Sequence, residues 1–194
     1  VGEVDLTASG ATRSWGIPPD VRWANVAFAA LFTVLFNFIE PICSLVTHAC
    51  YVLAWKWLAV GRLRPGTNVM RSRRALFAYA ILRRLVEAPN WARILELLDG
   101  TAWLGALYRA LGAKVGRQVL IGGLFVVEFD ALTVSDYVGS GSSSRANACD
   151  AEGVVAPIRL EAEATVGNSA ALYPGCSVGR RAVVGNDTVI CADR

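Results

Sequence analysis

The sequence predicts membrane helices followed by a small helical segment and a left-handed parallel β-helix of hexapeptide repeats. Two observations lead to this fold class. Aliphatic residues recur every six positions near the C-terminus, and apolar residues are concentrated in one long block near the N-terminus. With 54% hydrophobic and only 18% charged residues, the chain is too apolar for an ordinary soluble domain.

The six-residue repeat is the clearest pattern in the chain. Its aliphatic positions are Val154, Leu160, Val166, Leu172, Val178, Val184 and Ile190. A small residue lies two positions before most of them, at Ala164, Ala170, Cys176, Ala182 and Thr188. Three sides of six residues make one triangular coil of a β-helix, and each side must place an aliphatic side chain in the narrow interior. Glycine follows at Gly167, Gly179 and Gly185, where a corner favours a positive φ or a close backbone approach.

The β-helix is expected to occupy residues 113–194. Weaker copies of the repeat at Val115, Ile121 and Val127 extend it toward the N-terminus. The register shifts between residues 128 and 153, which predicts a loop or an irregular coil there. About four coils of roughly eighteen residues fit this length, which is a minimal solenoid. A chain that begins without Met and ends within a repeat is expected to be a fragment.

The apolar block predicts a transmembrane helical segment at 24–61, after an N-terminal linker at 1–23. Between residues 26 and 60 the ionisable side chains expected to be charged are Glu40 and Lys56. The block is long enough for more than one crossing at about 20 residues each. Pro41 interrupts it because proline cannot donate a backbone hydrogen bond. Residues 26–39 could therefore form a re-entrant arm, the end of a hairpin, or the first half of one kinked helix.

A run of arginines follows the apolar block and indicates its orientation. They are Arg62, Arg64, Arg71, Arg73, Arg74, Arg83 and Arg84, with no acidic residue between Glu40 and Glu87. By the positive-inside rule this side of the membrane is cytoplasmic, so we expect an integral membrane protein with its β-helix in the cytoplasm. The same arginines are expected to face a lipid bilayer, and no nucleic-acid partner is predicted.

Residues 62–112 are expected to form basic juxtamembrane helices. Apolar residues recur at helical spacing in three groups, which are Leu76, Phe77, Ala80, Ile81 and Leu85; Trp91, Ile94, Leu95 and Leu98; and Trp103, Leu104, Leu107, Tyr108 and Leu111. Gly100 and Thr101 end one helix and begin the next. These stripes fit core packing between short helices and contact with the membrane interface equally well.

Several segments carry a resemblance to a known family. Residues 57–66 read WLAVGRLRPG, residues 100–101 read GT, residues 108–116 read YRALGAKVG, and residues 128–133 read EFDALT. Together they resemble the membrane-tethered C-terminal region of poly-lysine-synthetase-like non-ribosomal peptide synthetases, over a stretch that runs roughly from residue 54 to the end. In that family, adenylation and carrier domains precede transmembrane helices that alternate with tandem β-helix-like domains.

The resemblance implies a function and partners for the whole protein. The β-helix domains of the family are proposed to join amino-acid units without a conventional condensation domain. We therefore expect acyl or aminoacyl transfer from a phosphopantetheine-borne thioester or from acyl-CoA, with no cofactor bound in these 194 residues. The expected partners are upstream adenylation and carrier domains and sister β-helix domains or a second copy of the chain. No adenylation or carrier segment occurs in this sequence.

A catalytic base is hard to find. Hexapeptide acyltransferases commonly use histidine, which can take a proton from an amine or hydroxyl near neutral pH. The single histidine, His48, lies in the apolar block, where it is either a hydrogen-bonded residue of a helix bundle or a functional group within the membrane. Related domains carry a histidine and an acidic residue whose positions correspond to Ala146 and Asp150 here. By that correspondence the base is missing, and Ala146→His is expected to raise transfer activity.

Polar residues near the shifted register are the remaining candidates for a substrate or cation site. They are Glu128, Asp130, Asp136, Arg145, Asp150 and Glu152, of which Asp150, Glu128, Asp130 and Arg145 are the catalytic candidates. The alternative for all of them is a solvated loop. The five cysteines lack a Cys-x-x-Cys spacing, so neither a metal site nor a disulfide framework is expected. Two function classes stay open, which are a transferase module and a structural module that packs against sister domains.

Overall fold

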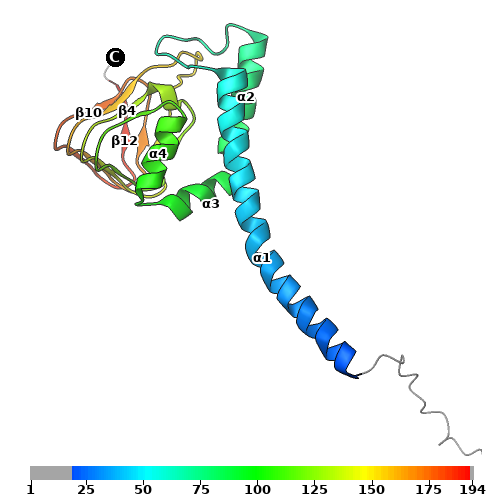
Figure 1. Cartoon of the computed structure of the whole chain (residues 1–194). Coiled ribbons are helices and arrows are strands. Elements are labelled where there is room, and N and C mark those ends of the chain that lie inside the picture. Colours follow the sequence, from blue (N-terminus) through cyan, green and yellow to red (C-terminus); the bar gives the residue numbers. More distant parts are fainter. Residues whose placement is uncertain (1–18, 193–194) are drawn as a thin grey trace, which may run out of the picture. The chain divides into compact units, whose positions relative to one another are not determined.

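The computed structural model describes residues 19–192 and divides the chain at Cys43 and Ser44 into two units. Helix α1 (Pro19–Trp55) begins in the first unit and ends in the second, where the π-helical turn η1 (Lys56–Val60) follows it (Figure 1). Together they contain one candidate membrane span, Asn25–Val60. Most of the predicted linker 1–23 lies outside the described residues, and its last five residues already belong to α1.

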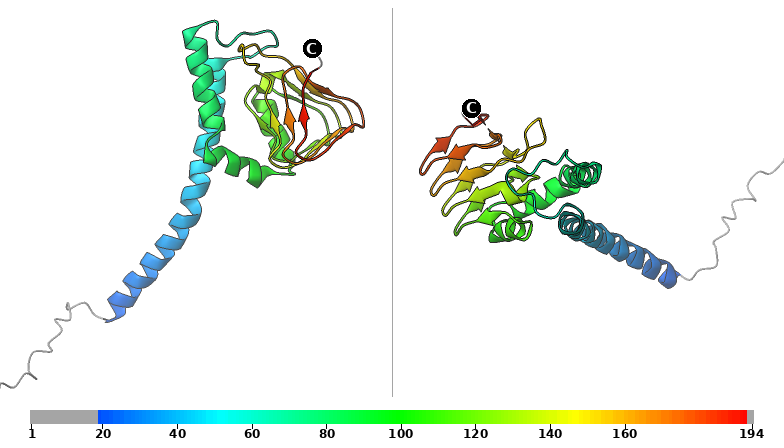
Figure 2. Two further views of the ribbon diagram at one scale, coloured as in Figure 1. Left: turned by 180° about the vertical axis from the view of Figure 1, so that it is seen from behind. Right: turned by 90° about the horizontal axis from the view of Figure 1, so that it is seen from above.

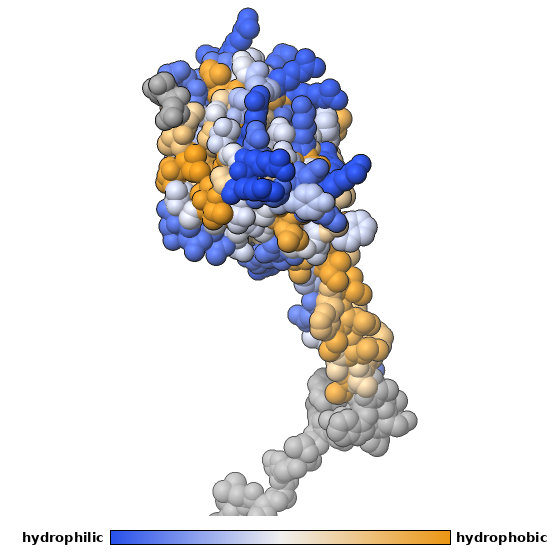
Figure 3. Space-filling view, turned by 90° about the vertical axis from the view of Figure 1, so that its left-hand side faces the viewer, coloured by the Kyte–Doolittle hydropathy of each residue, from blue (hydrophilic) through white to orange (hydrophobic). Residues whose placement is uncertain are grey.

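Helix α1 passes through Pro41 without a break, so the re-entrant arm and the hairpin are both wrong. A proline inside a helix removes one backbone hydrogen bond but does not have to end the helix. Of the polar side chains on this segment, Thr33 and Asn37 bond back to backbone carbonyls four residues earlier. Every side chain from residue 25 to 43 is exposed, and Figure 3 shows the resulting apolar surface in orange.

The segment after η1 contains three short helices, as the apolar spacing predicted. They are α2 (Arg73–Val86), α3 (Pro89–Leu98) and α4 (Ala102–Ala110). Pro89 stands at the first position of α3, where its missing N–H costs nothing. Gly100, with a φ of 66°, lies in the turn between α3 and α4. The predicted boundary at Gly100 and Thr101 is therefore confirmed.

The buried face of α2 differs from the predicted apolar stripe. Leu76 and Phe77 are 43% and 65% exposed, whereas Tyr79 and Leu82 are buried. The Tyr79 hydroxyl donates a hydrogen bond to Glu128, so the face of α2 that carries Tyr79 is the buried one. On α3 and α4 the prediction holds better, because Trp91, Ile94, Leu95, Leu104, Tyr108 and Leu111 are all buried.

The rest of the described chain forms twelve short strands. Their bounds are β1 (Lys114–Val115), β2 (Leu120–Ile121), β3 (Phe125–Val126), β4 (Leu132–Val134), β5 (Gly139–Ser140), β6 (Arg145–Ala146), β7 (Ile158–Leu160), β8 (Thr165–Val166), β9 (Ala171–Leu172), β10 (Ser177–Val178), β11 (Val183–Val184) and β12 (Val189–Ile190). They pair in three parallel sheets, ordered β1-β4-β7-β10, β2-β5-β8-β11 and β3-β6-β9-β12. Each strand pairs with the third strand further along, which is compatible with a β-solenoid of four coils. We call residues 114–190 the solenoid domain.

The strand register corrects the prediction of an irregular region between residues 128 and 153. Strands β4, β5 and β6 form a complete second coil, in which Val134 pairs with Leu160. The irregular parts are the 3₁₀ turn η2 (Phe129–Ala131) and the loop at 147–157. In the first coil Val126, rather than the predicted Val127, pairs with Ala146. This displacement by one position is why the repeat is weak there in the sequence.

The corners of the solenoid show whether glycine is needed there for a positive φ or for a close backbone approach. Positive φ angles occur mainly at non-glycine residues, namely Gln118, Tyr137, Ser143, Glu163, Ser169, Arg181 and Asp187. Gly167, Gly179 and Gly185 have no positive φ. A Cβ on Gly167 would lie 2.7 Å from the backbone nitrogen of Asn186 in the next coil, so a close approach explains this glycine. A Cβ on Gly179 would meet nothing within 4 Å and one on Gly185 would meet only Thr188, so no approach between coils explains these two.

Helix α4 lies against the first coil, beside β1 and β2 (Figure 2). The Tyr108 hydroxyl donates a hydrogen bond to the Leu124 carbonyl, and the fully buried ring of Tyr108 meets Phe129 edge to face at 5.4 Å. Trp91 of α3 contacts the same Phe129 ring at 6.3 Å. The three helices and the solenoid domain therefore share one hydrophobic core.

Candidate functional site

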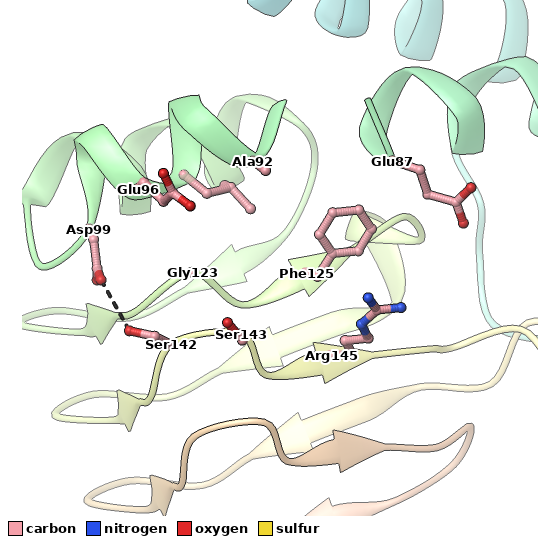
Figure 4. A pocket seen from close by; sticks show the side chains of 10 residues that line it. Glu87, Ala92, Glu96, Asp99, Gly123, Phe125, Ser142, Ser143 and Arg145 are labelled. Atoms are coloured by element: carbon pink, nitrogen blue, oxygen red, sulfur yellow. Dashed lines mark hydrogen bonds between the residues drawn. The ribbon is translucent and has the colours of Figure 1, made fainter. Parts of the chain in front are cut away.

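Two adjoining grooves lie beside α2 and α3, along the outward side of strands β3 and β6. Their volumes are about 470 and 310 Å³. Both grooves are lined by Glu87, Phe125 and Arg145, so they meet at these three side chains. We call the two grooves together the α3 cleft. Figure 4 shows its larger half, with α3 on one side and β3 and β6 on the other.

Arg145 is the sequence candidate that lies best for contact with a ligand. It is exposed on β6, and its guanidinium carbon is 5.6 Å from the centre of the Phe125 ring. No ion pair to Arg145 is formed by any residue between 19 and 192. In Figure 4 its side chain points toward Phe125, on the side of the cleft where Glu87 lies.

Acidic side chains line the other wall of the α3 cleft. Glu96 and Asp99 come from α3 and its C-terminal end, and both are exposed. Asp99 accepts a long hydrogen bond, 3.4 Å, from the hydroxyl of Ser142. Glu87 is already paired with Arg83 at 2.8 Å. Among the described residues, the cleft therefore presents the cation of Arg145 on the solenoid side and the carboxylates of Glu96 and Asp99 on the helix side, and none of the three forms an ion pair there.

Glu128 lies at the inner end of the smaller groove and is held by the fold. It is 3% exposed, accepts a hydrogen bond from the Tyr79 hydroxyl, and accepts another from the Ala148 backbone N–H at 3.1 Å. Burial and the Glu128 carboxylate raise the pKa of Tyr79, so its hydroxyl remains a donor. Burial also raises the pKa of the neighbouring Cys149, which keeps that thiol protonated and a poor nucleophile.

Asp150 also lines the smaller groove, but its carboxylate organises a turn. Its Oδ1 accepts hydrogen bonds from the backbone N–H groups of Glu152 and Val154, at 3.0 and 2.7 Å. Asp136 has a similar role at another corner, where it accepts from the Arg117 N–H at 2.7 Å. In both residues Oδ1 serves the backbone of the fold.

Ala146, at the position where the resemblance implies a histidine, points into the solenoid domain. Its side chain is 1% exposed, and it pairs with Val126 on one side and Leu172 on the other. A histidine at this position would enter an aliphatic interior and not the α3 cleft. Ala146→His is therefore not expected to raise transfer activity, contrary to the expectation from sequence.

Asp130 lies away from the α3 cleft and forms an ion pair that joins η1 to the solenoid domain. Its carboxylate is 2.9 Å from the Lys56 ammonium and accepts the Leu63 N–H at 2.9 Å. Lys56 is 1% exposed, which is unusual for lysine and explains why it stands in an apolar stretch. Gly112 passes so close that a Cβ there would lie 3.0 Å from the lysine nitrogen.

His48 is a hydrogen-bonded residue between helices, the first of its two interpretations. Its Nε2 donates to the Leu85 carbonyl at 2.9 Å, because a carbonyl can only accept. The cysteines at 43, 50, 149, 176 and 191 are all free thiols. Within residues 19–192 no group of three His, Cys, Asp or Glu side chains could hold a metal ion.

The structure therefore brings together Glu128, Arg145 and Asp150 and separates Asp130 from them. Sequence reasoning missed Tyr79, Glu87 and Glu96, which come from the helices and not from the shifted repeat. Only the tertiary packing of α2 and α3 places them beside the solenoid domain. Comparison with protein-family models, with curated proteins and with solved structures gave no match. The resemblance to synthetases therefore depends on the segments quoted above.

Proposed function

We propose that this chain is a membrane-tethered, left-handed hexapeptide β-helix module that supports acyl or aminoacyl transfer by binding the donor in the α3 cleft. The observation that carries the proposal is the guanidinium of Arg145 opposite the carboxylates of Glu96 and Asp99, none of which forms an ion pair within residues 19–192. An aminoacyl-phosphopantetheine thioester carries both complementary charges, an ammonium at one end and a phosphate at the other. Charge-assisted hydrogen bonds to both ends would fix its orientation.

The proposed role is positioning and not acid–base catalysis. The described residues that line the cleft include no histidine, and Glu128 and Asp150 are occupied by hydrogen bonds of the fold. Holding a thioester and an amine in a reactive geometry can by itself supply a large part of a rate enhancement. The acceptor amine and any proton acceptor would then come from the substrates or from another domain of the assembly.

The membrane arrangement is part of the same proposal. We infer that α1 crosses the bilayer once and that the solenoid domain lies on the cytoplasmic side, since the arginine-rich segment follows the span directly. The chain should then remain with the membrane fraction in high salt and be released by detergent. Release by salt alone would contradict the insertion of α1.

The binding experiment uses the full chain in neutral detergent and a non-hydrolysable thioether analogue of glycyl-phosphopantetheine, followed by calorimetry. We expect Arg145→Ala to weaken binding about tenfold, the value of one charge-assisted hydrogen bond. Arg159→Ala is the matched control, because Arg159 is also exposed on a solenoid strand but does not line the cleft. Equal losses in both variants would contradict the proposed site.

A structural module is the second candidate, and the occupied carboxylates favour it. Glu128, Asp130 and Asp150 all serve contacts within the fold. Such a module would bind no thioester analogue and would act by packing against sister domains. Acyl transfer from a thioester at an enzymatic rate by the chain alone would exclude this second function.

A further inference from the structure

A third groove, separate from the α3 cleft, lies at the C-terminal end of α1. Its volume is about 560 Å³, and its lining residues are Trp57, Arg62, Arg64, Pro65, Arg109, Gly112, Lys114 and Asp130. We call it the η1 groove. Four of these side chains are cations, and they come from the loop after η1, from α4 and from β1. The fold therefore gathers positive charge from segments about 50 residues apart in sequence.

The positive charge in the η1 groove is not balanced from within the described chain. The one acidic lining residue, Asp130, is matched by Lys56 at 2.9 Å. Arg109 donates to the carbonyl oxygens of Val115 and Gly116 and pairs with no carboxylate between residues 19 and 192. Arg62, Arg64 and Lys114 are exposed and likewise form no ion pair within that range.

Four like charges around one hollow repel one another, and a multivalent anion relieves that repulsion. Guanidinium groups fit phosphate oxygens in a two-point geometry, and a lysine adds a point charge. Carboxylates of proteins would be weaker candidates, because one carboxylate offers two oxygens to four cations. The chemistry of the groove therefore favours a phosphate group.

We infer that the η1 groove is a phosphate-binding site. The groove follows the candidate membrane span directly in sequence, and Trp57 lies on its wall with its indole N–H bonded to the Ala110 carbonyl at 2.9 Å. Tryptophan is favoured at the level of lipid headgroups, so a phospholipid headgroup is the first source of this phosphate. A soluble phosphate compound carries the same chemistry and is the second source.

The test compares two double variants of the full chain in neutral detergent. Arg62→Ala with Arg64→Ala removes two cations from the η1 groove. Arg71→Ala with Arg74→Ala removes the same charge from exposed positions outside it, and is the matched control. The probes are short-chain phosphatidic acid and, separately, inorganic phosphate, with binding measured by calorimetry and folding checked by thermal unfolding.

We expect the groove variant to bind at least one probe about a hundredfold more weakly than the wild type, about tenfold for each arginine. The control variant should bind within about threefold, and both variants should unfold at the wild-type temperature. Loss of phosphatidic acid binding alone identifies the lipid headgroup, and loss of inorganic phosphate binding as well identifies a site for soluble phosphates. Equal losses in both double variants, or no wild-type binding of either probe, would overturn the inference.

Discussion

The ion pair between Lys56 and Asp130 should be the most sensitive polar contact between η1 and the solenoid domain. Asp130→Asn removes the negative charge but keeps an oxygen that can accept the Leu63 N–H, which Asp130 now accepts at 2.9 Å. The substitution therefore isolates the effect of charge. It leaves the Lys56 ammonium, 1% exposed, without a counter-ion.

The magnitude follows from the distance and the burial. At 2.9 Å and an effective dielectric constant of about 20, the attraction between the two charges is about 6 kcal/mol. The cost of burying both charges offsets most of this attraction, so the pair adds little over an apolar contact. Removing one partner is different, because the burial cost of Lys56 remains. We expect Asp130→Asn to lower the free energy of unfolding by about 3 kcal/mol, the lower end for buried pairs because Asp130 is 11% exposed.

The assay is urea unfolding of the full chain in neutral detergent, followed by tryptophan fluorescence. Urea leaves the ionic strength unchanged, so it does not screen the ion pair. The double variant Lys56→Met with Asp130→Asn should recover at least half of the lost stability, since methionine fills a similar volume without a charge. Glu163→Gln, which breaks two exposed ion pairs, should leave the unfolding midpoint near that of the wild type. A loss below about 1 kcal/mol for Asp130→Asn, or a double variant as unstable as the single one, would refute the reasoning.

Two further predictions concern the interior of the solenoid domain and the response to alkaline pH. Ala146→His should lower the free energy of unfolding by about 3 kcal/mol, because the imidazole would be forced between Val126 and Leu172. For the same reason it should not raise transfer activity. A variant as stable as the wild type in urea unfolding would contradict this prediction. Burial and Glu128 raise the pKa of Tyr79 in the folded state, so above pH 10.0 the unfolded chain loses a proton that the folded chain keeps. The contribution of Tyr79 to the free energy of unfolding is therefore complete below that pH and falls as the pH rises above it. In unfolding curves recorded between pH 9 and 11, Tyr79→Phe should make the loss of stability with pH less steep. An equally steep loss in the variant would show that Tyr79 does not contribute.

The repeat and the helices could be predicted from sequence because both depend on local periodicity. Leu160, Leu172 and Val178 are buried where the six-residue spacing placed them. The spacing failed at Val126, because Val126 lies five positions after Ile121, whereas their partners Ser140 and Ala146 lie six positions apart. A pattern of period six cannot anticipate a side of the coil that is one residue shorter.

The candidate site was less accessible from sequence than the fold. Glu128 and Asp150 are polar residues near a shifted register and both lie at the α3 cleft, but they accept hydrogen bonds from the backbone. Lys56 is a rare charge in an apolar segment, and its partner Asp130 lies 74 residues later in the sequence. Partners so far apart are set by tertiary packing, and no local pattern records them.

The position of α4 determines at which end of the solenoid domain further coils can be added. The helix covers the first coil, beside β1 and β2, while each sheet ends in β10, β11 or β12 on the opposite side. The α3 cleft draws most of its solenoid residues from around β3 and β6, and Tyr173, directly after β9, is the last of them along the chain. Extra coils added after β12 would lengthen the stack without disturbing the cleft or the junction with η1. The number of coils in the solenoid domain can thus change without a change in the α3 cleft. Evolution or design could lengthen the domain while its binding surface stays the same.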